Sequence, residues 1–379
     1  MIYRTEPEKI QEYYDYPAIN QSGLKVILKD GIQIFKAQEE VIKGDMYYEE
    51  KAHFVIGKAI DCYITEGKEE FKRQFFISTL QKKPSDTLMS LLQMTFDNST
   101  LTDSDDISLN GFKEILHQSL KNHVDEKGKQ LYYDNRKKDN WQDDTRITSI
   151  LDNTVNHQYW NELIEANGKQ ILSDTEKAIV LGSEDRIGIV PSFLNHPNTR
   201  FLFDEKLENS RDIDIVYQFP IYESIDDIYT KKLLDCIYID HLKKIIRPLD
   251  IKSTREPVLM FNKAMKDRRY DLQGSFYYDS ICNPLNIDKL SIRTRKDLRG
   301  YRVANFAFVV ESTSLPGTPM IFPMGDDMLQ HGRVGNGIYL LGYKQGLDIY
   351  KKWLELDFTI ERMYPNGVLF IDNNFEYRV

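Results

Sequence analysis

The chain of 379 residues has few cysteines and no long apolar run. Its three cysteines, Cys62, Cys236 and Cys282, are far apart and show no C-x-x-C spacing. Neither a disulfide framework nor a zinc site is therefore expected. No apolar run approaches the roughly 18 residues that span a bilayer, and the first residues lack the apolar stretch of a secretory signal. These absences predict a soluble, cytoplasmic protein with no membrane partner.

An excess of positive charge is also missing, because 50 lysines and arginines stand against 59 aspartates and glutamates, for a net charge of -9. Lysine and arginine bind nucleic-acid phosphates, so this balance argues against a uniformly basic binding surface. Two local basic clusters, at 263–269 and 289–302, depart from the average. They would form a DNA track beside an acidic site, or they are ordinary solvated charges. The DNA-binding candidates in them are Arg268, Arg269, Arg293, Arg295 and Lys296.

The length fits one elaborated α/β domain or two closely packed lobes. A hydrophobic content of 41% is enough for a sizeable core. We expect residues 1–170 to form a helical part that contributes the motif Gly57–Asp61, and residues 171–379 to carry a sheet. The two parts are expected to make one integrated domain.

Local patterns place several elements of this second part. Ser173 and Glu176 have capping-box spacing and predict the start of a helix. Alternation over 212–219 and an apolar run within 303–311 predict strands. Residues 338–356 are patterned as a long amphipathic helix, and 368–372 would add an edge strand.

The most informative stretch runs from 231 to 277 and is patterned as two strands followed by helices. In the first strand, alternation puts Asp235 in line with Leu233, Ile237 and Ile239, so an acid occupies a position that a core would fill. In the second strand, Asp250 and Lys252 are two residues apart and share one side. Gln273 and Tyr277 are four residues apart and share one helix face. Their side chains are expected to converge on one cleft.

This set of residues suits phosphodiester hydrolysis. Two carboxylates can hold Mg²⁺, and the ion can bind a phosphate oxygen and acidify the attacking water. Lys252 would orient that water and offset developing charge. A lone D-x-K occurs by chance in most proteins of this size, so the hypothesis depends on the ordered set in its strand, strand and helix context.

These residues resemble the motifs of the PD-(D/E)XK nuclease superfamily. Asp235 matches the first acid, Pro248–Lys252 the second motif, and Gln273-x-x-x-Tyr277 the fourth motif of RecB-type members. The strand ending in DIKST looks like that of phage recombination exonucleases similar to exodeoxyribonuclease VIII, and the likeness runs from about residue 14 to residue 323.

The resemblance implies a fold and a role for each residue. The fold is α/β, a mixed central sheet flanked by helices, that is, a restriction-endonuclease-like nuclease core with an N-terminal helical elaboration. Asp235 and Asp250 would bind Mg²⁺, for which Mn²⁺ may substitute, with the carbonyl of Ile251 as a further ligand. Lys252 would position and activate water. Gln273 and Tyr277 would hold Lys252 and the scissile phosphate in register.

A second motif of the same group precedes the sheet. The opening helices often lead to G-x-x-x-H, which here is Gly57–Asp61, with Asp61 in place of histidine. An aspartate also ligates a hard cation, so Asp61 is a metal-ligand candidate, or it is a helix-surface acid.

Three residues follow the catalytic lysine directly. The hydroxyls of Ser253 and Thr254, beside Arg255, would contact DNA phosphate, or they cap the helix that Pro257 opens.

The resemblance implies a Mg²⁺-dependent deoxyribonuclease that digests linear double-stranded DNA from a 5′ end in phage-type recombination. It would act as a homo-oligomer with a single-strand annealing protein, in the host cytoplasm if the chain is phage-encoded. Two alternatives remain. One is a sequence- or structure-specific endonuclease of the same superfamily, and the other is an inactive DNA-binding or assembly protein on this fold.

Overall fold

A computed structural model describes residues 1–36, 52–80, 82–99, 107–124, 131, 143–203, 210–336, 340–357, 370–371 and 377–378. The chain divides into two compact units. The first contains Met1–Tyr48, Ile60–Gly67 and Leu181–Val379, and the second contains Glu49–Ala59 and Lys68–Val180. Among the described residues, no helix is both long and apolar enough to cross a membrane.

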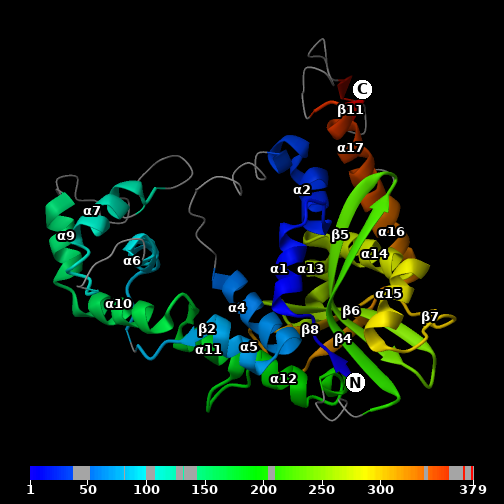
Figure 1. Cartoon of the computed structure of the whole chain (residues 1–379), viewed down its shortest axis with the longest axis horizontal. Coiled ribbons are helices and arrows are strands. Elements are labelled where there is room, and N and C mark those ends of the chain that lie inside the picture. Colours follow the sequence, from blue (N-terminus) through cyan, green and yellow to red (C-terminus); the bar gives the residue numbers. More distant parts are fainter. Residues whose placement is uncertain are drawn as a thin grey trace. The chain divides into compact units, whose positions relative to one another are not determined.

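The first unit is organised around a mixed sheet, which in the described residues has seven strands in the order β1-β4-β5-β6-β8-β9, with β7 pairing β6 (Figure 1). Parallel pairs join β1 to β4 and β6 to β7 and β8, and the other pairs are antiparallel. The strands are β1 (Ile2–Tyr3), β4 (Ile213–Ile225), β5 (Ile228–Asp240), β6 (Ile245–Thr254), β7 (Arg302–Val303), β8 (Ala307–Ser312) and β9 (Met320–Pro323). The predicted mixed α/β architecture is confirmed.

Four helices pack their apolar side chains against one face of this sheet. They are α2 (Gln21–Asp30), α14 (Tyr270–Ile281), α15 (Pro284–Thr294) and α17 (Tyr343–Glu355). Leu24, Phe276 and Leu347 are buried in one cluster with Ile237 and Phe308 from the strands. Burying a side chain of this size contributes about 1.5–3 kcal/mol, so this cluster fixes α14, with Gln273 and Tyr277, over β6.

Other elements complete the first unit. α1 (Pro7–Asp15) lies next to β4, and α12 (Ile189–Asn195) is tied to β8 by a hydrogen bond from Ser192 to Glu311. The short helix η2 (Arg200–Leu202) accepts the hydroxyl of Tyr217 at 2.8 Å. α13 (Phe261–Asp267) follows the short turn η4 (Val258–Met260), and α16 (Asp326–Val334) packs on α14 and α17.

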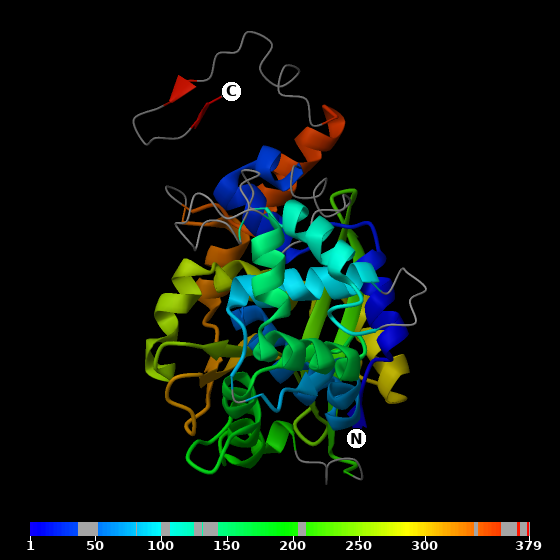
Figure 2. The same cartoon turned by 90° about the vertical axis from the view of Figure 1, so that its left-hand side faces the viewer.

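The second unit is mainly helical and has its own core. It includes α4 (Ala52–Asp61) up to Ala59, α5 (Lys68–Gln74), α6 (Asp86–Ser99), α7 (Lys113–Asn122), α9 (Asp143–Leu151), α10 (Thr154–Ala166) and the start of α11 (Asp174–Leu181). Leu91, Leu116, Ile147 and Trp160 are buried together where α6, α7, α9 and α10 meet (Figure 2). The parallel pair β2 (Phe75–Ile77) and β3 (Gln170–Leu172) completes the unit.

Several local predictions can be compared with these elements. The capping box is confirmed, because Ser173 and Glu176 exchange hydrogen bonds at the start of α11. The strand expected at 303–311 is two strands, β7 and β8. The helix expected from 338 begins only at Tyr343, with Gly342 as its N-cap residue, and 337–339 lie outside the described residues. The strand expected at 368–372 is β10 (Phe370–Ile371), which pairs with β11 (Tyr377–Arg378) and not with the edge of the central sheet.

Candidate acidic site at the divergence of two strands

The candidate site lies where β5 and β6 stop pairing. Their last pair on this side is Cys236 with Leu249, so Asp235 and Asp250 come next on the two strands. Beyond that point the carboxylate of Asp235 accepts the backbone N–H of Ile251 at 3.0 Å. A side chain thus takes the place of a ladder carbonyl, and the two strands can separate without leaving that N–H unsatisfied. This separation gives the two carboxylates room to lie side by side.

Asp250 is held by one residue from the helix and one from its own strand. Nε2 of Gln273 donates to its Oδ1 at 2.6 Å, and Nζ of Lys252 lies 2.5 Å from its Oδ2. Its side chain is 1% exposed. Oδ2 receives no hydrogen bond of good geometry from the described residues despite the ionic contact. Its remaining lone pairs are therefore available to a further electrophile.

Lys252 is kept in its charged form. Burial opposes that form, but the carboxylates of Asp250 and Asp235 outweigh it and raise the pKa of Lys252. Its ammonium lies 5.5 Å from the ring centroid of Tyr270, and that of Lys25, from α2, lies 5.1 Å from the same centroid. Burial and the nearby Lys252 lower the pKa of Lys25 to about 7. Two lysine side chains therefore stand near Asp250, and Lys252 is the one held in its charged form.

Asp61 joins this site from the end of α4, where the helix passes into a short π-helix at Cys62–Glu66. π-Turns of this kind are frequent at functional sites. Burial, together with the nearby Glu66 and Asp250, raises the pKa of Asp61 to about 7, although Lys252 opposes the shift. Its Oδ1 is buried and has no hydrogen-bond partner among the described residues.

Gln218, next to Phe219 on β4, has a left-handed backbone, with φ of 48°. Such a conformation is uncommon for a residue other than glycine and marks local strain. It also changes which residues face the helices. Val216 and Phe219, three apart, join the same core, as do Leu234 and Ile237 on β5. The expectation that Leu233 and Ile237 share one regular face is therefore wrong, because both strands switch faces beside Asp235.

The negative charges of the carboxylates repel one another at this site. Burial, followed by the charges of Asp250 and Asp61, raises the pKa of Asp235 well above its ordinary value. Carboxylate oxygens are the ligands that Mg²⁺ and Mn²⁺ prefer, and an ion between them would remove the repulsion. In the described part of the chain, no three His, Cys, Asp or Glu side chains are already arranged to hold a metal ion. The donor types fit a divalent ion held by two carboxylates with carbonyl and water oxygens, not by a complete cage of side chains.

Tyr277 is buried under the site, one turn beyond Gln273. Burial, with the nearby Tyr13, Asp250 and Asp235, raises its pKa, so the phenol is neutral. The sequence interpretation gave Gln273 and Tyr277 the role of holding Lys252. In the structure, Gln273 contacts Asp250 instead.

The predicted DNA-binding residues do not all lie together. Lys296 binds Asp214 at 3.1 Å, four residues along β4 from Gln218, and Arg293 lies 3.7 Å from Glu6. Arg295 is the left-handed residue that ends α15. Arg269 pairs with Asp271 at the start of α14, and among the predicted DNA-binding residues it is one whose charge reaches Lys25 and lowers the pKa of that lysine. Arg268 is exposed, as are Lys263 and Lys266 of the same cluster.

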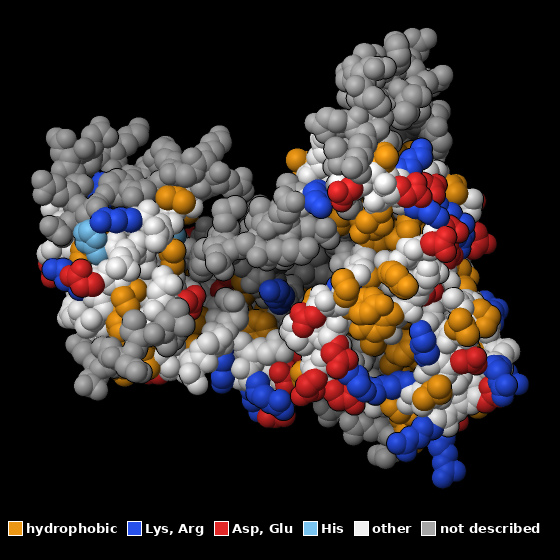
Figure 3. Space-filling view, turned by 45° about the horizontal axis from the view of Figure 1, so that its top comes forward, with side chains coloured by type: hydrophobic (Ala, Val, Ile, Leu, Met, Phe, Trp, Pro, Cys, Tyr) orange, Lys and Arg blue, Asp and Glu red, His pale blue; other side chains and the backbone are white. Residues whose placement is uncertain are grey.

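The strand end after Lys252 has a local structure of its own. Oγ1 of Thr254 accepts the N–H of Glu256 at 3.3 Å, which is a local turn contact. The short helix η4 after Pro257 has no side-chain cap, so the capping alternative is not confirmed. Ser253 pairs with Glu311 of β8, and Arg255 is exposed. On the face seen in Figure 3, lysines and arginines are interspersed with aspartates and glutamates.

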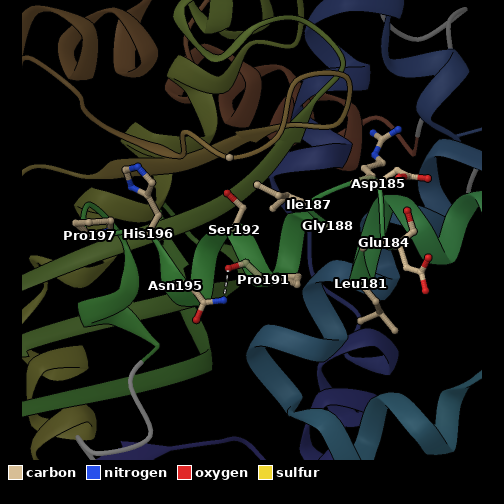
Figure 4. A pocket seen from close by; sticks show the side chains of 14 residues that line it. Leu181, Glu184, Asp185, Ile187, Gly188, Pro191, Ser192, Asn195, His196 and Pro197 are labelled. Atoms are coloured by element: carbon tan, nitrogen blue, oxygen red, sulfur yellow. Dashed lines mark hydrogen bonds between the residues drawn. The ribbon is translucent and has the colours of Figure 1, made fainter.

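A cavity of about 810 Å³ lies apart from these residues. It is lined by the turn at 182–188, by Pro191, Ser192 and Asn195 of α12, and by His196 and Gly317 (Figure 4). Asn195 donates back to the carbonyl of Pro191 at 2.9 Å. None of Asp235, Asp250 and Lys252 lines it, so this cavity and the acidic site are different places.

Comparisons with known proteins add little to this geometry. No family model and no curated protein matches the chain. Among solved structures, the crystal structure of a candidate exonuclease from Eubacterium rectale is similar, with 10% identity. The match covers 92% of this chain and 87% of that chain, with a TM-score of 0.33. A score this low does not establish a shared fold, so the site must be argued from its residues.

Proposed function

We propose that this protein is a deoxyribonuclease that hydrolyses phosphodiester bonds with the help of Mg²⁺ or Mn²⁺. The observation that carries the proposal is the convergence of Asp235, Asp250 and Asp61 around the ammonium of Lys252 at the divergence of β5 and β6. Opposed carboxylates beside a fixed cation cost stability, and functional sites are where such costs are commonly retained. The matching order of the nuclease-like motifs supports the same reading.

Asp235 and Asp250 would hold the ion, with the carbonyl of Ile251 and the carboxylate of Asp61 as further ligands. A divalent ion bound there polarises a phosphate oxygen and makes bound water more acidic. Oδ1 of Asp61, which is buried and has no hydrogen-bond partner among the described residues, has free coordinating capacity. Oδ2 of Asp250 contacts Lys252 and would share its remaining lone pairs with the ion.

The protein's own side chains orient the attacking water and the carboxylate of Asp250, and they offset charge on the phosphate. Lys252 stays protonated, so it acts as a hydrogen-bond donor that offsets charge on the phosphate and orients the attacking water, not as a base. Gln273 fixes the rotamer of Asp250. The neutral phenol of Tyr277 is buried within electrostatic reach of Asp250 and Asp235.

The finer proposal is an exonuclease on linear double-stranded DNA that starts at a 5′ end. It includes a homo-oligomer, a single-strand annealing protein as partner, and a role in phage-type recombination. Its support is the motif order, including the DIKST strand, and no feature of the site geometry adds to it. Arg269, near Lys25, is the predicted DNA-binding residue best placed to meet a phosphate.

One experiment tests the activity. Wild-type protein is incubated with linear duplex and with covalently closed circular DNA, with Mg²⁺, with Mn²⁺ and with EDTA. We expect linear DNA to be degraded only with an ion, and circles to stay intact. Lys252→Ala should abolish degradation while retaining DNA binding. Lys113→Ala, at an exposed position on α7, is the matched control and should behave as wild type.

The other outcomes are equally definite. Cleavage of closed circles would replace the exonuclease by an endonuclease of the same chemistry. Wild-type protein that binds DNA but leaves both substrates intact with either ion would overturn the enzyme and favour a DNA-binding or assembly role.

A further inference from the structure

A group of tyrosines stands beside the acidic site at the end of α1. Tyr13 and Tyr14 lie edge to face with ring centroids 5.4 Å apart, and Tyr16 lies 4.7 Å from Tyr222 of β4. Tyr13 also approaches Tyr222, at 6.3 Å, so the four rings form one cluster. The outer rings are open to solvent, since Tyr14 is 62% exposed and Tyr16 is 38% exposed.

A buried lysine fixes this cluster in place. Nζ of Lys231, on β5, donates to the carbonyls of Tyr13, Tyr14 and Tyr16 at 2.9, 2.8 and 2.8 Å. Those carbonyls belong to the last turn of α1 and the residue after it, where carbonyls have no partner within the helix. Lys231 is only 8% exposed and pairs in register with Tyr222. Exposed rings on a backbone held this firmly lose little further entropy when a ligand binds.

The cluster is close to the acids. Lys231 precedes Asp235 by four residues on the same strand, a separation of about 13 Å at roughly 3.3 Å per residue. Partial desolvation and the carboxylates of Asp61, Asp235 and Glu66 raise the pKa of Tyr14, so its hydroxyl lies within their electrostatic reach. Successive nucleotides of one strand of duplex DNA rise about 3.4 Å along the helix axis, so the same distance corresponds to about four stacked nucleotides.

We propose that Tyr14 and Tyr16, supported by Tyr13 and Tyr222, form a stacking platform for unpaired bases of the DNA strand whose phosphate enters the acidic site. The proposal rests on the proposed nuclease function for the identity of the strand. Bases stack on aromatic rings whatever their sequence, and an acidic surface that repels phosphate gains affinity from such contacts. The platform would hold a few separated nucleotides of a DNA end, and the acids would take the phosphate.

The test uses short single-stranded oligonucleotides with 2-aminopurine at successive positions from the end, bound to full-length Lys252→Ala protein with Mg²⁺. Stacking quenches the fluorescence of this base. We expect quenching to peak within about four nucleotides of the position held at the site. Tyr14→Leu and Tyr16→Leu, each in that background, should remove the peak and weaken binding by about tenfold. Tyr14→Phe should retain both.

Two controls separate the platform from other effects. Tyr229→Leu changes a tyrosine that is 66% exposed on the same hairpin and should leave binding and quenching unchanged. An oligonucleotide with abasic residues at the quenched positions should bind wild-type and Tyr14→Leu protein equally. Circular dichroism and thermal melting check that each variant is folded.

Different results would overturn the stacking platform and the nuclease activity. Leucine variants that quench and bind as well as the parent protein, or a parent protein that quenches at no position, would overturn the platform even if wild type degrades DNA. A wild type without nuclease activity whose quenching still depends on Tyr14 and Tyr16 would overturn the nuclease and leave the platform standing.

Discussion

Gln273 donates through its side-chain amide to Oδ1 of Asp250 at 2.6 Å, in a place where both residues are buried. The contact links α14 to β6 and leaves Oδ2 of Asp250 facing Lys252. The orientation of the carboxylate thus depends on a helix that packs over the sheet. Contacts of this kind orient a ligand before the substrate arrives.

Replacing Gln273 with alanine should lower nuclease activity by roughly 10- to 100-fold, because Asp250 loses the partner that fixes its orientation. Steady-state rates with saturating Mg²⁺ measure the effect. Gln93→Ala is the matched control, since Gln93 donates to Asp97 on the surface of α6 at 2.8 Å. Equal activity in the two variants would contradict the orienting role of Gln273.

Asp235→Asn should make the ion-free protein more stable, because it removes a carboxyl group whose ionised form is opposed by burial and by the charges of Asp250 and Asp61. The asparagine oxygen can still accept from Ile251. Wild-type protein should gain about 2.7 kcal/mol when free Mg²⁺ is about 100 times its Kd, and the variant should gain much less. Urea unfolding with EDTA and with Mg²⁺ measures both. The same ion-induced gain in the variant would exclude Asp235 as a ligand.

Gly332→Ala should destabilise the first unit by about 3 kcal/mol, at the upper end for overpacked positions. A methyl group there would overlap the carbonyl oxygen of Asp271 and the hydroxyl of Ser275, so α16 would be forced away from α14. Denaturant unfolding measures the loss. Gly325→Ala, at the open N-cap of α16, meets nothing within 4 Å and should cost less, about 0.5–1 kcal/mol, because alanine is a poorer N-cap residue than glycine.

Mild acid should destabilise the second unit through His123. This side chain is 2% exposed, its Nε2 lies 3.0 Å from Oγ of Ser90, and burial lowers its pKa below the ordinary 6.5. Between the folded and unfolded pKa values the unfolded chain binds the extra proton, so the stabilisation present above pH 6.5 is lost as pH falls. Urea midpoints at pH 7.5 and 5.5 should differ less for His123→Gln than for wild type. An unchanged difference would contradict this assignment.

The sequence was informative where short-range periodicity determines geometry. Alternation was sufficient to place Asp250 and Lys252 on one side of β6, and helical spacing was sufficient to place Gln273 and Tyr277 on α14. It could not show Lys25, which reaches Tyr270 only because α2 packs against α14. Nothing about a glutamine within an alternating strand indicates the left-handed backbone of Gln218, which depends on the tertiary contacts around it.

The sequence predicted the surroundings of Asp61 only in part. Its place in Gly57–Asp61 made it a candidate, but its neighbour Glu66 carried no signal, because a helix of ordinary pitch would not be expected to widen into a π-turn there. The basic residues Arg293 and Lys296 show that closeness in sequence does not ensure a common set of contacts. Their clustering in sequence suggested a common role, yet their ion pairs lie around Glu6 and Asp214.

The carboxylate of Asp235 accepts a backbone N–H in place of an inter-strand carbonyl, and it also faces the other acids. Alanine at this position would remove the carboxylate and also leave the backbone N–H of Ile251 without its acceptor. A loss of activity could then come from the missing metal ligand or from disturbed strand pairing. An amide side chain separates the two, which makes asparagine the informative replacement and alanine a misleading one.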